Sequence, residues 1–450
     1  MKQMDIKSAG APYLKLTPES IMKHPPMGWN SWDCFGASVT EDEVRANAQY
    51  IHDHLKDYGW SYVVVDIQWY EGTADSWNYH KFADLTLDAY GRPQPDARRF
   101  PSAANGAGFK PLADFVHSLG LQFGLHIMRG IPRQAVHQNL PILNGNGMTC
   151  REAASEQSIC LWNTDMYGAD ARQDAARAWY DAQYQQFADW EVDYIKVDDI
   201  AWNFMADGHY AAGDVELISK AIHKTGRPMV LSLSPGPAVY EEREHLMQHA
   251  HLWRMTDDFW DQWPLLLTVI KRCHEWQSVV SPGNWPDADM LPLGFLRNRQ
   301  GRGEMSKFTR DQQRMVMNLW SVFRSPLMMG GDLVHNDAWT LSLMTNRDLL
   351  DLNQNGAWPH ELCYDIDGLI AWTQLSDEGE ANSLLLINPT AEDLRVSIDL
   401  GQEPWSQLGT DTIALREVWD ETAPIRLQAG EAREFVVRGE GSLCYKKERE

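Results

Sequence analysis

Two aspartates and a lysine stand at the end of an apolar run in the stretch WEVDYIKVDDI, residues 190–200. The run is rich in β-branched residues and reads as a buried strand, where an ionised carboxylate is costly unless it is paired. The pattern therefore indicates a structural ion pair or a catalytic site. Lys196 lies two residues before Asp198 and so points to the same face of a strand, where its charge would keep that carboxylate ionised and nucleophilic.

Comparable polar side chains follow the other apolar runs of the chain. They are Trp32, Asp66 with Trp69, His126 with Arg129, Asp199 beside Asp198, Ser234, Arg254 with Asp257 and Asp258, and Asp287 with Asp289. Two aspartates on different strands, near tryptophans and without metal-ligand spacing, suit glycoside hydrolysis, in which one carboxylate is the nucleophile and the second is acid and then base.

Several of these residues have plainer interpretations. Aspartates after strands often cap the next helix, and we expect Asp199 and Asp257 to do only that. His126 is as consistent with a buried core histidine as with a site residue. Arg254 lies four residues before Asp258 and could merely neutralise it, or donate to a sugar hydroxyl.

The elements that must position these side chains follow from the periodicity of the chain. Short apolar segments begin near residues 27, 62, 122, 193, 229, 252 and 326, and a less regular one spans 284–291. Stretches between them, such as 40–59 and 171–190, place apolar residues at helical spacing behind capping residues. Eight strands alternating with helices predict an α/β fold, a (β/α)8 TIM barrel with its site at the carboxyl ends of the strands, ahead of an open doubly wound sheet.

The pattern changes after NRDLLDLNQNGAW, residues 346–358. The segments LIAWTQL, NSLLLIN, LRVSIDL and AREFVVR lie between Gly, Asp, Asn and Pro clusters without a helical period. They predict a small C-terminal antiparallel β-sandwich domain. We therefore expect a catalytic barrel over 1–358 and a β domain over 359–450, with the last five residues, KKERE, as a solvated tail.

The composition of the chain restricts the kinds of molecule that it is expected to bind. A net charge of −23 over 450 residues repels nucleic-acid phosphates and anionic lipid, so we expect a carbohydrate substrate and neither nucleic acid nor membrane. Residues 1–20 have no continuous apolar segment of the secretory type. Six scattered cysteines are expected to be free thiols, which with the N-terminus predicts a cytoplasmic location. Oligomeric state is left open.

Several motifs together, taken in chain order, resemble those of glycoside hydrolase family 27, the melibiase-like α-galactosidases and α-N-acetylgalactosaminidases. The motifs are MGWNSWDCFG (27–36), YVVVDIQW (62–69), WEVDYIKVDD (190–199), LWRMTDD (252–258), WPDADMLPLG (285–294), NLWSVFRSPLMMGGDL (318–333) and NRDLLDLNQN (346–355). The family's fold is a barrel followed by an antiparallel β domain, as expected here.

The resemblance implies roles for individual residues. Asp198 falls on the family's nucleophile and Asp258 on its acid/base, so both must share one cavity, and no cofactor or metal is implied. Lys196 and Arg254 fall on sugar-binding positions. Trp32, Asp66 and Asp289 fall on positions that line the family's sugar pocket. Trp69, His126 and Ser234 are further expected substrate contacts because they stand at the ends of the predicted strands.

The chain departs from the family at three positions. The family usually has a second aspartate where Ile67 stands, so one acceptor for a sugar hydroxyl is replaced by an apolar side chain. It usually has tyrosine in place of His126, and a half-cystine in place of Ile200. In the loop SLSPGPAVY, Ser234, Gly236 and Pro237 resemble the small residues that admit a 2-acetamido group.

These observations predict a retaining, exo-acting α-glycosidase that removes terminal α-galactose-type residues by double displacement. An α-N-acetylgalactosaminidase or a β-L-arabinopyranosidase on the same scaffold are the alternatives within the family. From other classes, a noncatalytic carbohydrate-binding barrel would need neither aspartate, and a metal-dependent hydrolase would use His126 and the aspartates as ligands.

Overall fold

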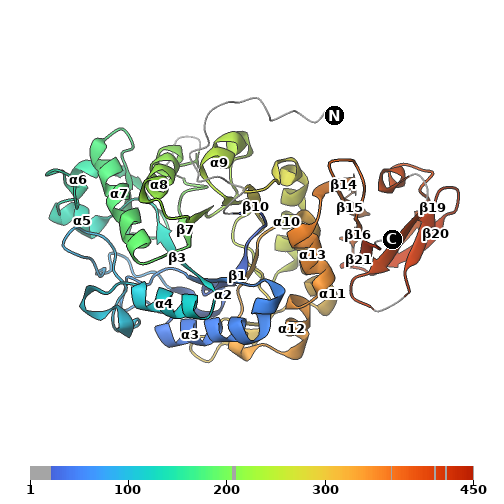
Figure 1. Cartoon of the computed structure of the whole chain (residues 1–450), viewed down its shortest axis with the longest axis horizontal. Helices are drawn as coiled ribbons and strands as arrows, with labels where there is room; N and C mark the ends of the chain where they lie inside the picture. The colour runs from blue at the N-terminus through green and yellow to red at the C-terminus, as the bar shows by residue number, and fades with distance from the viewer. Residues whose placement is uncertain (1–21, 205–208, 366, 410–411, 421–422, 449–450) are drawn as a thin grey trace.

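The computed structural model describes residues 22–204, 209–365, 367–409, 412–420 and 423–448. The expectation about residues 1–20 lies outside these ranges, as do residues 449–450 of the predicted tail. Within them, a barrel of parallel strands is followed by antiparallel sheets near the carboxyl end of the chain (Figure 1). No helix in the described ranges is long and apolar enough to cross a membrane.

Eight parallel strands form the barrel wall, and they fall in the eight segments predicted from the sequence. In sheet order they are β10 (Trp285–Asp287), β9 (Leu252–Arg254), β8 (Val230–Leu233), β7 (Tyr194–Asp198), β3 (Gln122–Met128), β2 (Tyr62–Val65), β1 (Met27–Asn30) and β13 (Leu327–Met329).

The two ends of this sheet meet just beyond β10. The amide of Leu291 donates to the carbonyl of Met328 at 2.7 Å, and the amide of Gly330 donates to the carbonyl of Leu291 at 3.0 Å. A parallel bridge between Leu291 and Met329 completes the contact. The predicted barrel is thereby confirmed, and the irregular segment 284–291 both supplies β10 and closes the ring.

The strands are buried on both faces, because helices cover the outside and side chains fill the inside. Every residue of β2, for example, is buried. Close packing also fixes a glycine in the motif MGWN: a Cβ at Gly28 would lie 2.4 Å from the carbonyl oxygen of Tyr62 on β2.

Helices surround the strands (Figure 1). The longer ones are α3 (Glu41–Tyr50), α4 (Lys110–Ser118), α7 (Asp174–Asp189), α8 (Ala212–Thr225), α9 (Arg243–His249), α10 (Trp263–Trp276), α11 (Arg310–Phe323), α12 (Ala338–Met344) and α13 (Arg347–Asn355). The predicted helix over 40–59 is α3 with a further π-helical turn, Ile51–Leu55, and it begins in a capping box between Thr40 and Glu43.

Smaller elements lie in the loops that follow the strands. The loop after β1 contains α2 (Trp32–Phe35). The long connection after β3 contains α5 (Arg133–Gln138), α6 (Cys150–Ala153) and a three-stranded sheet of β4 (Ile131–Pro132), β6 (Met166–Ala169) and β5 (Ala154–Ile159). The connection after β10 contains the hairpin of β11 (Phe295–Leu296) and β12 (Glu304–Met305).

Two antiparallel sheets make up the C-terminal region. The larger sheet has the order β14 (Trp358–Tyr364), β15 (Ile370–Leu375), β16 (Ser383–Asn388), β21 (Gly441–Lys447), β18 (Thr412–Glu417) and β19 (Ile425–Gln428). The smaller one pairs β17 (Leu394–Ile398) with β20 (Arg433–Val437). The predicted change of fold class is confirmed, while the exact division into domains at 358/359 stays a prediction.

Strand β16 shows how the two regions pack. Leu384 and Leu386 belong to the core between the two antiparallel sheets, whereas Leu385 and Ile387 belong to the large core of the barrel. Successive side chains of a strand point to opposite faces, so β16 is apolar on both. The helices α11 and α13 lie between the barrel and this sheet (Figure 1).

The predicted solvated tail is wrong for its first two residues. Lys446 and Lys447 complete β21, and the ammonium of Lys446 lies 2.5 Å from a carboxylate oxygen of Asp351 on α13 and 3.4 Å from one of Asp348. The sequence shows only a run of charges at the end of the chain, so it does not indicate these ion pairs between β21 and α13.

Candidate active site

The predicted site residues gather at one end of the barrel. Lys196 and Asp198 lie on β7, His126 lies on β3 and Arg254 ends β9. Trp32, Asp66, Ser234, Asp258 and Asp289 follow the carboxyl ends of β1, β2, β8, β9 and β10. This is the end at which barrel enzymes carry their sites.

Asp66, Lys196, His126 and Asp198 form one buried chain of contacts. The ammonium of Lys196 donates to Oδ2 of Asp66 at 2.9 Å, and Asn30 donates to the same oxygen at 2.8 Å. Nε2 of His126 lies 2.9 Å from Oδ2 of Asp198 and 3.9 Å from Oδ1 of Asp66. Lysine and histidine thus stand between two carboxylates and offset the cost of burying them.

This arrangement keeps both carboxyl groups ionised. Burial alone would raise the pKa of Asp198, but the hydrogen bond and charge of His126, the charge of Lys196 and the amide of Asp199 lower it to about 2. Burial likewise opposes ionisation of Asp66, yet Lys196 and His126 hold its pKa below the ordinary value. Asp198 is therefore a carboxylate over the whole physiological pH range, as a nucleophile must be.

The orientation of Asp198 is fixed by the peptide that follows it. Asp199 adopts a left-handed conformation with φ of 58°, and its amide donates to Oδ1 of Asp198 at 2.8 Å. Arg129 holds this turn from the other side: its Nε donates to the carbonyl of Asp199 at 2.5 Å and its Nη2 lies 3.1 Å from the Asp199 carboxylate.

Asp199 is therefore an ion-pair partner and not a helix cap. The next helix, α8, begins at Ala212, and the side chain of Asp199 is occupied by Arg129. Asp257 is not a cap either, because Gln262 stands at the N-cap of α10 and Oδ1 of Asp257 accepts from the neighbouring amide of Asp258 at 2.9 Å. Both capping predictions are wrong, because irregular loops separate these strands from their helices.

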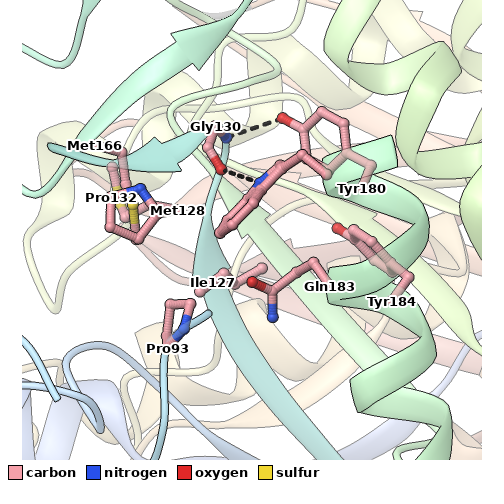
Figure 2. A pocket seen from close by; sticks show the side chains of 10 residues that line it. Pro93, Ile127, Met128, Gly130, Pro132, Met166, Tyr180, Gln183 and Tyr184 are labelled. Atoms are coloured by element: carbon pink, nitrogen blue, oxygen red, sulfur yellow. Dashed lines mark hydrogen bonds between the residues drawn. The ribbon is translucent and has the colours of Figure 1, made fainter. Parts of the chain in front are cut away.

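Gly130, the residue after Arg129, is anchored to helix α7. Its amide donates to the hydroxyl of Tyr180 at 2.9 Å, and its carbonyl accepts from Nε1 of Trp179 at 2.9 Å (Figure 2). The Tyr180 hydroxyl in turn donates to Asp214, whose carboxylate lies 3.8 Å from Nη1 of Arg129. A buried polar network thus extends from α7 and α8 to the loop beside Asp198.

Arg254, Asp258 and Asp289 form the second half of the site. Nη2 of Arg254 lies 3.1 Å from Oδ1 of Asp258 and 2.8 Å from Oδ2 of Asp289. The side chain of Asp289 is 3% exposed, whereas that of Asp258 is 59% exposed. Asp258 is thus held by one bond at the open side of the site, where a leaving group and a water molecule can reach it.

Mutual electrostatic effects connect the two halves. Burial and then the charges of Asp198, Asp66 and Asp258, in that order, raise the pKa of Tyr79. The ammonium of Lys196 interacts with Asp66 and Asp198 and also with Arg254 and Asp289. Tyr79 and Lys196 therefore each lie close enough to interact with charged groups in both halves of the site.

Trp69 does not belong to the site, and its prediction as a substrate contact is wrong. The side chain is fully buried, with its ring centroid 5.1 Å from that of Phe109 and 6.1 Å from that of Trp190. Its Nε1 donates to the carbonyl of His126 at 2.6 Å. The chain turns directly after Asp66, and this turn directs the indole into the layer between barrel and helices.

His126 and Ser234 lie beneath the mouth and not on its surface. His126 is fully buried, and its Nε2 lies 2.9 Å from Oδ2 of Asp198. Ser234 is 1% exposed, and its backbone bridges β7 and the following loop through the carbonyl of Val197 and the amide of Ile200. Asp66 is equally buried, at 1%, so direct substrate contact by His126 and Ser234 stays a prediction.

Close packing explains one of the small residues in the loop after β8, Gly236. A Cβ at Gly236 would lie 2.1 Å from the carbonyl oxygen of Thr256 and 2.6 Å from that of Arg254. Glycine is required here by the backbone of β9 and the residues after it. Its presence therefore says nothing about space for a 2-acetamido group.

Two side chains of the site were missed in the sequence. Asp33, next to Trp32, is 1% exposed, and burial followed by the charge of Asp289 raises its pKa well above the ordinary value. Tyr79 stacks on Trp32 at a centroid distance of 6.0 Å. A carboxyl beside Trp32 in the motif NSWDCFG was a usable signal for the first, whereas Tyr79 lies in a loop without any pattern.

One group of side chains among the described residues has spacing suitable for a metal ion: Asp114, His117 and Glu191. Lys110 already binds Asp114 and lies 3.5 Å from Glu191, and Nε2 of His117 lies 2.7 Å from Asp193. These contacts describe a surface ion cluster, and none of its members is a predicted site residue.

A (β/α)8 barrel with paired aspartates at its mouth suits a glycoside hydrolase. Comparison with known proteins agrees. A family profile described as Alpha galactosidase A (Melibiase_2) matches residues 171–355. An α-galactosidase of Cyamopsis tetragonoloba is 27% identical over 90% of this chain and 82% of its own length.

Two solved structures are more similar. A family 27 β-L-arabinopyranosidase from Geobacillus stearothermophilus is 46% identical, with 96% of this chain and 98% of that chain covered and a TM-score of 0.90. A putative α-N-acetylgalactosaminidase from Bacillus halodurans is 44% identical, with 95% and 97% covered and a TM-score of 0.83. The chain belongs to glycoside hydrolase family 27.

Proposed function

We propose that this glycoside hydrolase removes terminal β-L-arabinopyranosyl residues, with net retention, using Asp198 as nucleophile and Asp258 as acid/base. The observation that carries the proposal is the setting of Asp198, ionised between His126 and Lys196 in the barrel mouth, while Asp258 stands at the open side.

In the first step, an oxygen of Asp198 attacks the anomeric carbon and forms a covalent ester. The bond from that carbon to the glycosidic oxygen breaks, and protonated Asp258 delivers its proton to the departing oxygen. The amide of Asp199 and Nε2 of His126 hold the two oxygens of Asp198, so the attacking group needs little reorganisation.

In the second step, Asp258 is a carboxylate and accepts a proton from water. The resulting hydroxyl attacks the anomeric carbon and breaks the ester to Asp198, so the sugar leaves with its original anomeric configuration. Arg254 supports this state because its guanidinium lies 3.1 Å from Asp258. Asp66 and Lys196 are the proposed ligands for sugar hydroxyls, since they offer a carboxylate and an ammonium beside Asp198.

The choice of sugar rests on Ile67. β-L-Arabinopyranose and α-D-galactopyranose share their configuration around the ring and differ by a hydroxymethyl group on C5. Where the family usually has an aspartate, this chain has an apolar side chain that is 1% exposed, so an acceptor for a sugar hydroxyl is missing. The β-L-arabinopyranosidase from Geobacillus, a variant of which has been solved in complex with arabinose, is 46% identical to this chain.

The test is a panel of aryl glycosides: β-L-arabinopyranoside, α-D-galactopyranoside and 2-acetamido-2-deoxy-α-D-galactopyranoside. We expect kcat/KM to be higher for the arabinopyranoside than for the galactoside by roughly 10- to 100-fold, the range for one small group in an apolar pocket. Proton NMR of the first-formed sugar should show the substrate's anomer. An inverted product, or Asp198→Asn that retains full turnover, would overturn the mechanism.

α-D-Galactosides are the second candidate, because the other residues of the site do not distinguish the two sugars. Ile67→Asp should raise kcat/KM for the galactoside relative to the arabinopyranoside, because it introduces the missing acceptor. Ile67→Val is the matched control and should keep the preference. A wild type that prefers the galactoside would transfer the proposal to that sugar.

A further inference from the structure

A row of aromatic rings begins at the barrel mouth. The ring of Trp32, after β1, is nearly parallel to that of Tyr79, after β2, with an interplanar angle of 8° and a centroid distance of 6.0 Å. Tyr79 in turn lies 5.2 Å from Trp162, in the long connection after β3. Three loops that follow neighbouring strands therefore each contribute one ring.

The inner end of the row adjoins Asp66 of the proposed site, through Trp32 and Asn30. Burial, followed by the charges of Asp198, Asp66 and Asp258, raises the pKa of Tyr79, which agrees with this placement. Trp32 adjoins the site from the other side, since its amide donates to Asn30, which also donates to Asp66.

The outer end of the row is open to solvent. Trp162 is 37% exposed, and its neighbour Leu161 is 61% exposed. Phe82, at 72%, belongs to the same surface because its amide donates to Oγ1 of Thr164 at 2.6 Å. Large apolar side chains at this exposure are not core filler, and a group of them beside a site indicates a binding surface.

We propose that Tyr79, Trp162 and Phe82 form the subsite for the leaving group, and that its occupant is the sugar ring next to the residue removed. This rests on the proposed function, because it adds the second half of the same substrate. A pyranose ring presents C–H bonds on its faces, which pack on aromatic rings, while its hydroxyls point to water.

Continuity with the catalytic site favours this occupant over others. An exo-acting enzyme encloses the terminal sugar, so the rest of the substrate must leave the pocket past the acid/base. Asp258 is 59% exposed, and the row begins at Trp32, which Asn30 joins to Asp66 of the same site. The guanidinium of Arg133, 5.8 Å from the ring centroid of Phe82, adds donors for sugar hydroxyls at the rim.

The experiment measures a ratio: kcat/KM for a disaccharide divided by kcat/KM for the methyl glycoside, both carrying whichever terminal sugar the wild type hydrolyses. We expect Trp162→Ala to lower this ratio roughly five- to tenfold, the effect of losing one aromatic contact. Trp162→Phe keeps a ring and should lower it less than twofold. Phe204→Ala is the matched control, since it removes an aromatic side chain of 63% exposure that meets Trp202 edge-to-face outside the row.

Other outcomes would overturn the proposal. Equal losses with both substrates would show that Trp162 supports the fold or the terminal sugar, and an unchanged ratio would show no leaving-group contact. A smaller assembly for Trp162→Ala in analytical ultracentrifugation, with an unchanged ratio, would assign the surface to subunit contact. If the wild type cleaves no glycoside, the proposed function fails. The subsite is then tested by comparing the dissociation constants of the disaccharide and the methyl glycoside.

Discussion

His126 is the residue on which the ionisation of Asp198 depends most directly. Its hydrogen bond of 2.9 Å is the first cause that lowers the pKa of Asp198 against the effect of burial. Most members of the family have a tyrosine at this position, which offers a hydroxyl donor without a charge. The histidine in this chain, together with Lys196, therefore holds Asp198 in its ionised form.

Removal of this donor should change the pH profile. In His126→Leu, burial is opposed only by Lys196 and the Asp199 amide, so the pKa of Asp198 should rise. The acidic limb of kcat/KM against pH, which reports the free enzyme, should then move up by about one to two pH units. His126→Tyr restores a donor and should move it less. An acidic limb that is identical in wild type and His126→Leu would contradict this account.

At the same scale, the sequence predicted the placement of Lys196 and Asp198 better than that of Trp69 and Ser234. Lys196 and Asp198 could be paired in advance because strand alternation puts them on one face. Trp69 and Ser234 could not be placed, because the turn after a strand decides whether a side chain enters the mouth or the surrounding layer. Asp199 was misread because its partner, Arg129, lies 70 residues earlier in the chain.

At the scale of elements, Gln374 on β15 joins the β region to the barrel helices. The side chain is fully buried, and its Nε2 lies 2.9 Å from the carbonyl of Val322, 3.0 Å from that of Leu352 and 3.3 Å from that of Ser321. These carbonyls belong to the last turns of α11 and α13. Carbonyls in the last turn of a helix have no hydrogen-bond donor within their own helix.

Gln374→Leu should therefore destabilise the protein. The carbonyls lose their donor but remain buried, which costs about 1–3 kcal/mol in the free energy of unfolding. Urea denaturation measures the change, and Gln428→Leu on the exposed part of β19 is the control, expected within about 0.5 kcal/mol of wild type. Equal stability of the two variants would mean that Gln374 does not hold the helix ends.

The elements themselves were largely predictable. Seven of the eight barrel strands lie in apolar runs bounded by polar turns, and β10 lies in the less regular segment 284–291. Four strands of the β region were found by the same signal as the seven. The strands β14, β18, β19 and β21 were missed, because each mixes charged or polar residues with apolar ones on edges and exposed faces. The contacts that join the two regions, such as Gln374, arise only in the folded chain.

At the scale of the whole molecule, the buried carboxyls and the large negative charge both make the free energy of unfolding fall as pH rises. Burial raises the pKa of Asp33, Asp165, Asp199 and Asp289 above the ordinary value, in Asp199 to about 7. A carboxyl whose pKa is higher in the folded state contributes stability below its unfolded pKa and loses it as pH rises through the folded one. The lowered pKa of Asp198 has the opposite effect. It stabilises the folded state above about pH 4, and this contribution is lost as pH falls to about 2.

The free energy of unfolding should therefore be greater at pH 5 than at pH 8, and the net charge of −23 adds repulsion in the same sense. Asp199→Asn cannot ionise, so it should narrow the difference between the two pH values. Asp174→Asn removes the same formal charge from a side chain that is 81% exposed and should leave the difference nearly unchanged. Urea denaturation of the three proteins at both pH values is the measurement. If the two variants behave alike, net charge and not the buried carboxyl governs the pH dependence of stability.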